Sequence, residues 1–371
     1  MERKYLEYFD GVFDSTVAEK MQPENWPYIG YSETDGFAFT VIAVPITSNG
    51  PWVTFTALED NSSIGLEKLS TNQTLEYSTG TSIWNPFDIT TNISLNNGDK
   101  VYIRGVLSDN NTDSNYTQFK MTGKIAASGN CTAIWNYQDL NASLKEYCGK
   151  SMFLNCTALT KAPDLQATTL AYACYAGMFF GCTSLTQPPT LSATTLAYSC
   201  CSNMFRDCTS LTQAPDLQAT ILTEYCYSCM FYGCTSLTHP PILPSTTLAR
   251  SCYYYMFGEC SGLTQAPELP ATTLALYCYE GMFWGCTGLT QGPELPALTL
   301  TKWCYGYMFK GCSNLNYIKC LATDISAIDC TEDWVFPVST TGTFVKHPSM
   351  NNWTTGVSGI PSGWTVVDAD L

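Results

Sequence analysis

The richest chemistry of this 371-residue chain lies in its 19 cysteines, because a thiol can form a disulfide, bind zinc or act as a redox nucleophile. Fourteen of them fall into two columns with a period of 26 residues, before and after a Met-Phe pair that keeps the same period. Such registration without insertions indicates similar units stacked in a line. The columns are Cys148, Cys174, Cys200, Cys226, Cys252, Cys278 and Cys304, and Cys156, Cys182, Cys208, Cys234, Cys260, Cys286 and Cys312.

The spacing of these cysteines favours packing over covalent or metal chemistry. Stacked neighbours could lie within disulfide range, but each column has seven members, which leaves one unpaired and favours no particular register. Zinc sites use compact Cys-x-x-Cys pairs, and only Cys226 and Cys229 have that spacing. Free cysteine is a small residue that is usually buried. We therefore expect buried thiols, and neither a metal nor a cofactor.

The two histidines do not suggest catalysis. His239 and His347 are far apart in the sequence, and His239 occupies a column that otherwise holds glutamine, as at Gln213 and Gln265. No phosphate loop, nucleophile elbow or paired-acid motif is visible. The sequence therefore predicts no catalytic residues and a chain that is not an enzyme, and an enzyme on a β-sandwich scaffold is the least favoured alternative.

The repeat predicts one short helix and one short extended stretch in each unit. From Leu170, apolar residues at offsets 0, 4, 8, 9, 12 and 15 lie on one half of a helical wheel. Gly181 suits the left-handed end of a helix of about three turns. The stretch "LTQPPTL" that follows contains prolines, so any strand there is only a few residues long. The predicted core of the unit is Cys174, Met178, Phe179, Cys182 and Leu185.

These elements predict a multidomain α+β protein with four parts. Residues 1–32 form an anchoring or docking segment, and residues 33–128 form an antiparallel β-sandwich of short strands separated by turns. Residues 129–319 form a solenoid of seven 26-residue units. Residues 320–371, where the repeat decays, form a C-terminal cap.

The unit resembles the BspA-like leucine-rich repeats of bacterial and protozoan surface proteins. That motif has an Ala-Phe pair, then Gly-Cys, Ser-Leu-Thr and an Ile-Pro stretch. Its equivalents here are Met178-Phe179, Gly181-Cys182, Ser184-Leu185-Thr186 and the segment 188–191. The likeness covers about residues 144 to 319, with a longer period and Met in place of Ala. It implies a leucine-rich-repeat solenoid and a role at a surface.

The segment "VAEKMQPENWPYIGYS" resembles leader segments of structural proteins of phages that infect gut bacteria. This likeness implies a virion component that is assembled in the host cytoplasm. It fits an N-terminus without the apolar core of a secretory signal, from which we expect folding in a reducing cytoplasm and reduced thiols.

The composition of the chain excludes some classes of binding partner. Only 13% of the residues are charged, and the net charge of −15 repels nucleic acid and anionic membrane surfaces. No run of about 18 apolar residues exists, so we expect no membrane insertion.

Positions that vary between units predict a binding surface. The three residues after the leading cysteine are rich in Tyr, Ser and Gly, the residue types that are enriched in antibody binding sites. We expect an aromatic strip to contact a host glycan or protein. Its members are Tyr253, Tyr254, Tyr255, Tyr279, Trp284, Trp303, Tyr305 and Tyr307.

Two functions remain open on the sequence. The preferred one is a phage virion display protein, a head or tail fibre that contacts other virion proteins through residues 1–32 and presents the repeats to the host. The alternative is a bacterial cell-surface adhesin. Because cyclic symmetry is common in fibres, we expect a homo-oligomer.

Overall fold

The computed structural model describes residues 8–9, 12–13, 29–30, 40–41 and 50–370, with side chains over 50–370. The chain divides into two compact units, one of Met1–Gly50 with Gly80–Trp84 and one of Pro51–Thr79 with Asn85–Leu371. In the first unit, β1 (Tyr8–Phe9) pairs with β2 (Val12–Phe13), and β3 (Ile29–Gly30) pairs with β4 (Thr40–Val41), both antiparallel. The rest of the predicted docking segment lies outside the described residues.

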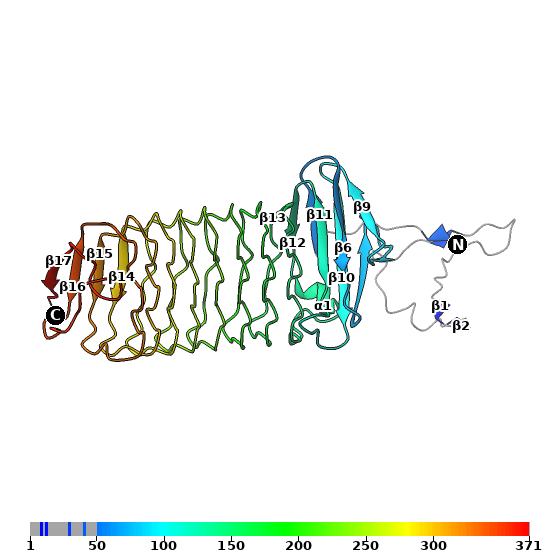
Figure 1. Ribbon diagram of the computed structural model, residues 1–371. Helices are drawn as coiled ribbons and strands as arrows, with labels where there is room; N and C mark the ends of the chain where they lie inside the picture. The colour runs from blue at the N-terminus through cyan, green and yellow to red at the C-terminus, as the bar shows by residue number, and fades with distance from the viewer. Residues whose placement is uncertain (1–7, 10–11, 14–28, 31–39, 42–49, 371) are drawn as a thin grey trace. The chain divides into compact units, whose positions relative to one another are not determined.

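Two sheets are built from strands within residues 53–128 and from one strand of the first coil, at residues 159–161 (Figure 1). One has the strand order β13-β12-β5-β10-β7-β8 and the other has the order β11-β6-β9. Their facing side chains meet, since the rings of Phe55 and Phe119 lie 5.6 Å apart. The strands are β5 (Val53–Ala57), β6 (Ser62–Lys68), β7 (Gln73–Ser78), β8 (Asn85–Pro86), β9 (Asn92–Leu95), β10 (Lys100–Leu107), β11 (Gln118–Thr122), β12 (Ile125–Ser128) and β13 (Leu159–Lys161).

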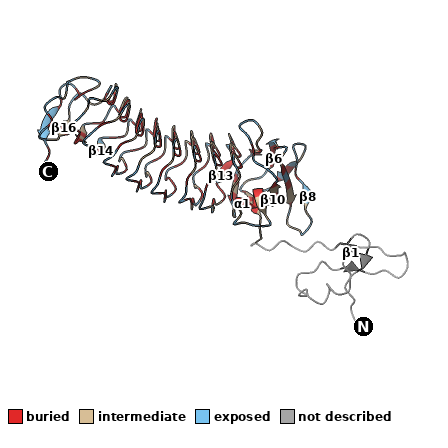
Figure 2. Ribbon diagram, turned by 90° about the horizontal axis from the view of Figure 1, so that it is seen from below, coloured by how far each residue is buried: buried red, intermediate tan, exposed pale blue. Residues whose placement is uncertain are grey.

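The first sheet continues into the repeat region without a break. All its pairings are antiparallel except that of β12 with β13, which is parallel and joins the first coil to the sheet. The short helix α1 (Thr132–Asn136) buries four of its five residues at this junction (Figure 2). One hydrophobic core extends from Val53 to Trp364. The sheets therefore cover the first coil of the stack.

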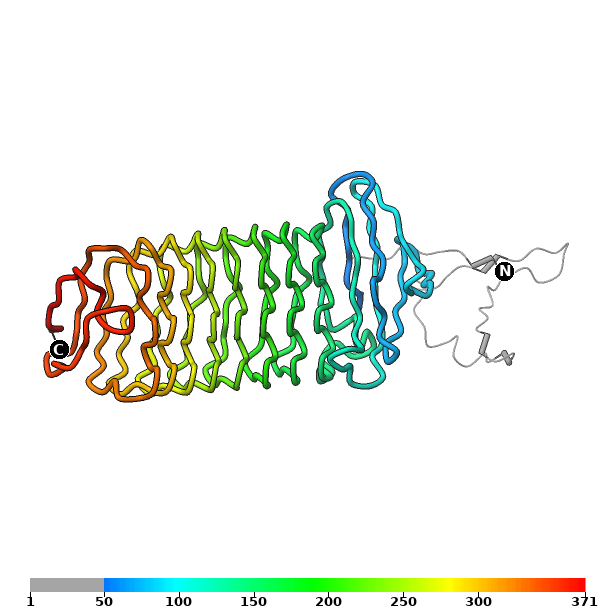
Figure 3. The backbone as a smooth tube through the Cα atoms, in the orientation of Figure 1, coloured from blue at the N-terminus to red at the C-terminus, as the bar shows by residue number. Residues whose placement is uncertain are grey.

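From Cys148 onwards the chain runs in coils that follow one another in sequence order (Figure 3). Segments one repeat apart form parallel bridges, such as Leu165 with Leu191 and Thr247 with Thr273. At the C-terminal end these contacts become a parallel sheet of β14 (Gln291–Leu295), β15 (Tyr317–Cys320), β16 (Thr343–Lys346) and β17 (Thr365–Asp368). The repeat region is a β-solenoid with almost no helix.

The predicted helix in each unit is wrong, because α1 is the only helix in the described part of the chain. The segment instead forms consecutive four-residue turns, with left-handed backbone at Ala173 (φ 46°), Gly177 (φ 60°) and Gly181 (φ 72°). The left-handed residue predicted at Gly181 is present, but it ends the last of these turns. No helix among the described residues is long and apolar enough to span a membrane.

Hydrogen bonding explains why turns replace the helix. The N–H of Met178 donates to the carbonyl of Tyr175 in its own coil at 3.1 Å, whereas the N–H of Phe179 donates to the carbonyl of Met204 in the next coil at 2.9 Å. This alternation continues along the segment, so every second N–H bonds to the neighbouring coil. An α-helix would use these donors internally and leave the coils unconnected.

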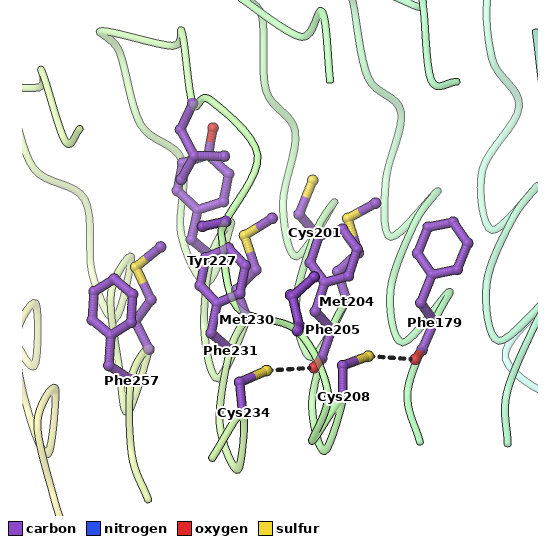
Figure 4. Close-up of a cluster of buried hydrophobic side chains, with 14 of the residues drawn as sticks. Phe179, Cys201, Met204, Phe205, Cys208, Tyr227, Met230, Phe231, Cys234 and Phe257 are labelled. Carbon is purple, nitrogen blue, oxygen red and sulfur yellow. Dashed lines mark hydrogen bonds between the residues drawn. The ribbon is translucent and has the colours of Figure 1, made fainter. Parts of the chain in front are cut away.

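The core of the coils is a ladder of stacked rings (Figure 4). Cys174, Met178, Phe179, Cys182 and Leu185 are fully buried, with 0% of each side chain exposed. Successive Phe rings from Phe153 to Phe309 lie 5.4–5.8 Å apart and are nearly parallel. Burying one such ring contributes about 1.5–3 kcal/mol. The same side-chain packing therefore repeats in every coil.

The trailing cysteines are hydrogen-bond donors as well as small buried residues. All seven thiols of this column donate to the carbonyl oxygen of a Phe in the preceding element of the stack, at S···O distances of 2.9–3.3 Å. Figure 4 shows two of them, from Cys208 to Phe179 and from Cys234 to Phe205. All 19 cysteines are free thiols. The thiols therefore connect adjacent coils without covalent bonds.

The stack does not stop at residue 319, where the cap was expected to begin. Strands β15, β16 and β17 continue the parallel sheet to Asp368. Cys330 and Trp334 follow Cys304 and Met308 by one period, and the N–H of Phe309 donates to the carbonyl of Trp334 at 2.8 Å. Another coil is therefore present in the segment that was assigned to the cap.

Cysteine-to-serine substitutions should destabilise the fold by different amounts in the two cysteine columns. Cys226 and Cys234 belong to one coil and are both fully buried, but only Cys234 donates a side-chain hydrogen bond, to Phe205 at 3.1 Å. We expect Cys226→Ser to lower the free energy of unfolding by about 1–3 kcal/mol, because it buries a hydroxyl without a partner. Cys234→Ser should cost less than about 1 kcal/mol, because its hydroxyl inherits the bond. Chemical denaturation measures both, and equal losses would contradict a donor role.

Candidate functional site

The structure divides the predicted aromatic strip into two groups. Tyr253, Tyr279 and Tyr305 are at most 1% exposed and stack on one another inside the coils, with ring centroids 5.8 and 6.2 Å apart. The hydroxyls of Tyr279 and Tyr305 have no hydrogen-bond partner in the described part of the chain. These three residues are core, so their assignment to a binding surface is wrong.

The four-residue turn explains this error. In a helix, the residue after the leading cysteine would point about 100° away from it. In the turn, both residues of the pair point inward, as Cys174 and Tyr175 do, and as Met178 and Phe179 do four residues later. The outward positions are the next two residues of each turn. Tyr254, Tyr255, Trp284, Trp303 and Tyr307 are accordingly half-buried.

These five residues and Tyr232 form a cluster that we call the aromatic face. Tyr254 and Tyr255 lie 4.6 Å apart, Trp284 lies 6.1 Å from Tyr255 and 6.2 Å from Tyr232, and Trp303 lies 5.3 Å from Tyr307. All distances join ring centroids. Tyr232 was not part of the predicted strip. The cluster therefore spans several coils.

Glycines on neighbouring coils allow these rings to lie against the backbone. A Cβ on Gly258 would come within 2.7 Å of the Tyr232 ring, and one on Gly306 within 2.5 Å of the Trp303 ring. A Cβ on Gly281 would collide with the ring of Tyr255. The rings therefore occupy the space of missing side chains. Tyr232 and Tyr255 cover the coil next to their own, whereas Trp303 covers a glycine of its own coil.

Two cations border the aromatic face. The guanidinium of Arg206 lies 4.5 Å from the ring centroid of Tyr232, and the ammonium of Lys310 lies 4.8 Å from that of Tyr307. Both already have acidic partners, since Arg206 pairs with Asp207 at 3.7 Å and Lys310 with Asp333 at 2.9 Å. Their charges are thus largely compensated by residues of their own surroundings.

Glu280 is the unusual polar residue of this region, and no pattern in the sequence distinguishes it. It follows buried Tyr279, lies one coil after Tyr254 and is only 8% exposed. No described residue donates a hydrogen bond to its carboxylate or forms an ion pair with it. Burial raises the pKa of Glu280 to about 7. Burial, followed by the charge of Glu280, raises the pKa of Tyr254 to about 12.

The other candidate residues do not assemble into a reactive site. The ring nitrogen Nδ1 of His239 lies 2.9 Å from the Thr238 hydroxyl, and that of His347 lies 2.7 Å from the Ser349 hydroxyl. Among the described residues, no cluster of three or more His, Cys, Asp or Glu side chains could hold a metal ion. Burial raises the pKa of thiols such as Cys208 and Cys234, which disfavours the nucleophilic thiolate.

Clefts occur between coils on the extended side. One of about 540 Å³ is lined by Thr264, Gln265, Ala266, Thr290, Gln291 and Gly292. Its lining is neutral and open, without a charged or aromatic side chain. The aromatic face with Glu280 therefore remains the stronger candidate site.

The buried carboxylate predicts a dependence of stability on pH. Because the pKa of Glu280 is about 7 in the folded chain and near 4.5 when unperturbed, the folded state retains a proton that the unfolded chain has lost in between. The resulting stabilisation is complete below about pH 4.5 and is lost as the pH rises through about 7. Glu280→Gln stays neutral at every pH.

We therefore expect the Tm of the wild type to fall relative to that of Glu280→Gln as the pH rises from about 4.5 to 8. Thermal unfolding at several pH values measures this difference. Glu268→Gln is the control, because Glu268 is exposed on the extended side of the coils. A parallel pH dependence in all three proteins would contradict burial of the Glu280 charge.

With this geometry in view, comparison with known proteins assigns no relatives: no family model, curated protein or solved structure matches the chain.

Proposed function

We propose that the chain is a non-enzymatic structural and binding protein, a display component of a phage virion such as a head or tail fibre. The observation that carries the proposal is the contrast between the two sides of each turn. Inward positions repeat the same Cys, Met and Phe side chains in each coil, whereas outward positions vary and gather aromatic rings on one face. A constant scaffold with a variable surface suits recognition of a partner.

We propose further that residues 129–319 are seven leucine-rich-repeat units of the BspA-like type and that the preceding sheets form a β-sandwich. The spacing of 26 residues, the buried column of Leu185, Leu211 and Leu237, and the inter-coil bonds support the repeat assignment. The contact between Phe55 and Phe119 supports the sandwich. In this arrangement the sandwich protects the first coil.

Attachment through the N-terminus is open to a direct test. If residues 1–32 bind other virion proteins, their deletion should abolish incorporation into particles, while the remaining chain still folds around its own core. Mass spectrometry of purified particles measures incorporation, and circular dichroism of the isolated variant checks folding. Wild-type levels of a folded deletion variant in the particles would contradict the docking role.

Binding of the host through the aromatic face is tested by truncating its rings. Tyr254→Ala and Trp284→Ala should each weaken binding to host cells or to a glycan array by about tenfold, because each removes a large rigid contact. Tyr172→Ala is the matched control, because Tyr172 is 39% exposed and lies in an earlier coil, towards the N-terminal end of the stack. Unchanged binding in both test variants would move the site elsewhere.

The repeat motif itself favours one alternative, a bacterial cell-surface adhesin, because the motif resembles that of surface proteins. Neighbouring genes distinguish the two. Capsid, portal and tail genes beside this one support the virion component, whereas secretion and polysaccharide-utilisation genes support the adhesin. A glycan or a protein of the opposing cell surface would be the partner in either case.

A further inference from the structure

We propose that Glu280 and the surrounding rings of the aromatic face bind an alkylammonium group, for which choline is a suitable probe. This inference rests on the proposed function, because it specifies the chemistry of a ligand at the same surface. Neither a cofactor nor a covalent step is involved. The site combines a carboxylate without a partner among the described residues and aromatic rings on the neighbouring coils.

The charge of Glu280 has no partner in the described part of the protein. A buried carboxylate is ordinarily hydrogen-bonded or paired with a cation, because desolvation penalises the isolated charge. The two cations that border the aromatic face pair with other carboxylates, Arg206 with Asp207 and Lys310 with Asp333. Glu332, two coils further along the same column, accepts a hydrogen bond from the Ser358 hydroxyl at 3.4 Å. Glu280 alone in this column therefore lacks compensation, and a bound cation would provide it.

The rings around Glu280 suit a cation with alkyl substituents. Tyr254 and Tyr255 lie on the preceding coil, and Trp303 and Tyr307 lie on the following one. The glycines beside Glu280 in its own and the next coil, Gly281 and Gly306, have no side chains, and the Tyr255 and Trp303 rings occupy that space. Aromatic faces attract ammonium groups through their quadrupole, and the attraction is strongest where water is excluded. The methyl groups of a quaternary ammonium would meanwhile bury apolar surface against these rings.

A neutral sugar fits these observations less well. Sugar hydroxyls could donate to the carboxylate, but they would leave its negative charge buried and uncompensated. An alkylammonium group satisfies the charge and the rings together. A quaternary ammonium and the primary ammonium of a partner's lysine share this chemistry. Two probes distinguish these two sources: choline, and lysine that is acetylated on its α-amino group and amidated, called N-acetyl-lysine amide here, which keeps the side-chain ammonium free.

The test is titration of the full-length protein with choline and with 3,3-dimethyl-1-butanol, an uncharged molecule of similar shape. We expect choline to bind and the alcohol to bind at least tenfold more weakly. Glu280→Gln should lose at least tenfold in choline affinity, while Glu268→Gln retains wild-type affinity. Tyr255→Leu should weaken binding several-fold, whereas Tyr172→Ala should not. Thermal unfolding confirms that each variant is folded.

Binding should also depend on pH. The titratable groups that interact with the carboxylate are Tyr254 and Tyr255 on the preceding coil. Burial raises the pKa of Glu280 to about 7. The charged carboxylate is the binding form. Choline affinity should therefore be about tenfold higher at pH 8 than at pH 6, and Glu280→Gln should abolish this difference.

Two results would overturn the inference. Equal affinity for choline and its uncharged analogue would show that charge is not recognised, and full binding by folded Glu280→Gln would remove the carboxylate from the site. A third result, absence of binding by both choline and N-acetyl-lysine amide while Tyr254→Ala still reduces host binding, would refute ammonium recognition and leave the proposed function intact. If Tyr254→Ala and Trp284→Ala both bind the host as well as the wild type does, the proposed function of this face is itself refuted.

Discussion

The structure depends on one constraint, that every second backbone N–H of the turn segments donates to the next coil. The N–H groups of Gly177 and Phe179 both do so, at 2.8 and 2.9 Å, while the intervening N–H of Met178 stays within its own coil. This division satisfies the polar backbone of a segment that is enclosed on both sides by other coils. It also fixes the length of the unit, because an inserted residue would shift all later donors away from their acceptors. The turns require residues with left-handed backbone, which is energetically unfavourable for side chains other than glycine. These residues include bulky ones such as Tyr277 and Trp303. The stack must over-determine these conformations, which isolated chains would avoid.

The side chains inside the coils are those that this backbone accommodates. Adjacent coils are so close that each ring stacks on the equivalent ring of the next coil. The ring centroids of Phe205 and Phe231 lie 5.6 Å apart, and their planes differ by only 3°. A thiol at the trailing position is small enough for the gap and can still donate to the Phe carbonyl of the preceding coil. The abundance of cysteine thus has a structural explanation that needs neither metal nor disulfide. In the leading column only Cys148 and Cys304 donate, over long S···O distances of 3.9 and 3.8 Å, whereas every thiol of the trailing column combines packing with a hydrogen bond.

Some of this could be predicted from the sequence, and the reasons for the failures are specific. The period, the two cysteine columns, the buried set around Phe179 and the left-handed Gly181 all follow from repetition and residue type. The turn was mistaken for a helix because apolar residues at Leu170, Cys174, Met178 and Cys182 are four apart, and over three steps a helix drifts by only about 120°. That mistake placed Tyr253 and its stacked partners on the surface. Not every strand of the sheets has a recognisable pattern: β6 contains Ser, Gly, Glu and Lys, which are not typical of a strand. Glu280 could not be selected, since only the coils before and after it determine its burial.

The aromatic face has a further property that follows from the distance between coils. A large side chain at an outward position extends over the adjacent coil, so the residue below it must be small. Tyr232 over Gly258 and Tyr255 over Gly281 both obey this rule, since an added Cβ would approach the Tyr232 ring to 2.7 Å and would collide with the Tyr255 ring. Outward positions therefore cannot vary independently, even though none of them belongs to the core. A change of ligand at such a surface requires paired substitutions on neighbouring coils, one that adds a ring and one that removes a side chain. The scaffold thus restricts which surfaces it can present, and the glycines beside the rings help to determine the shape of the aromatic face.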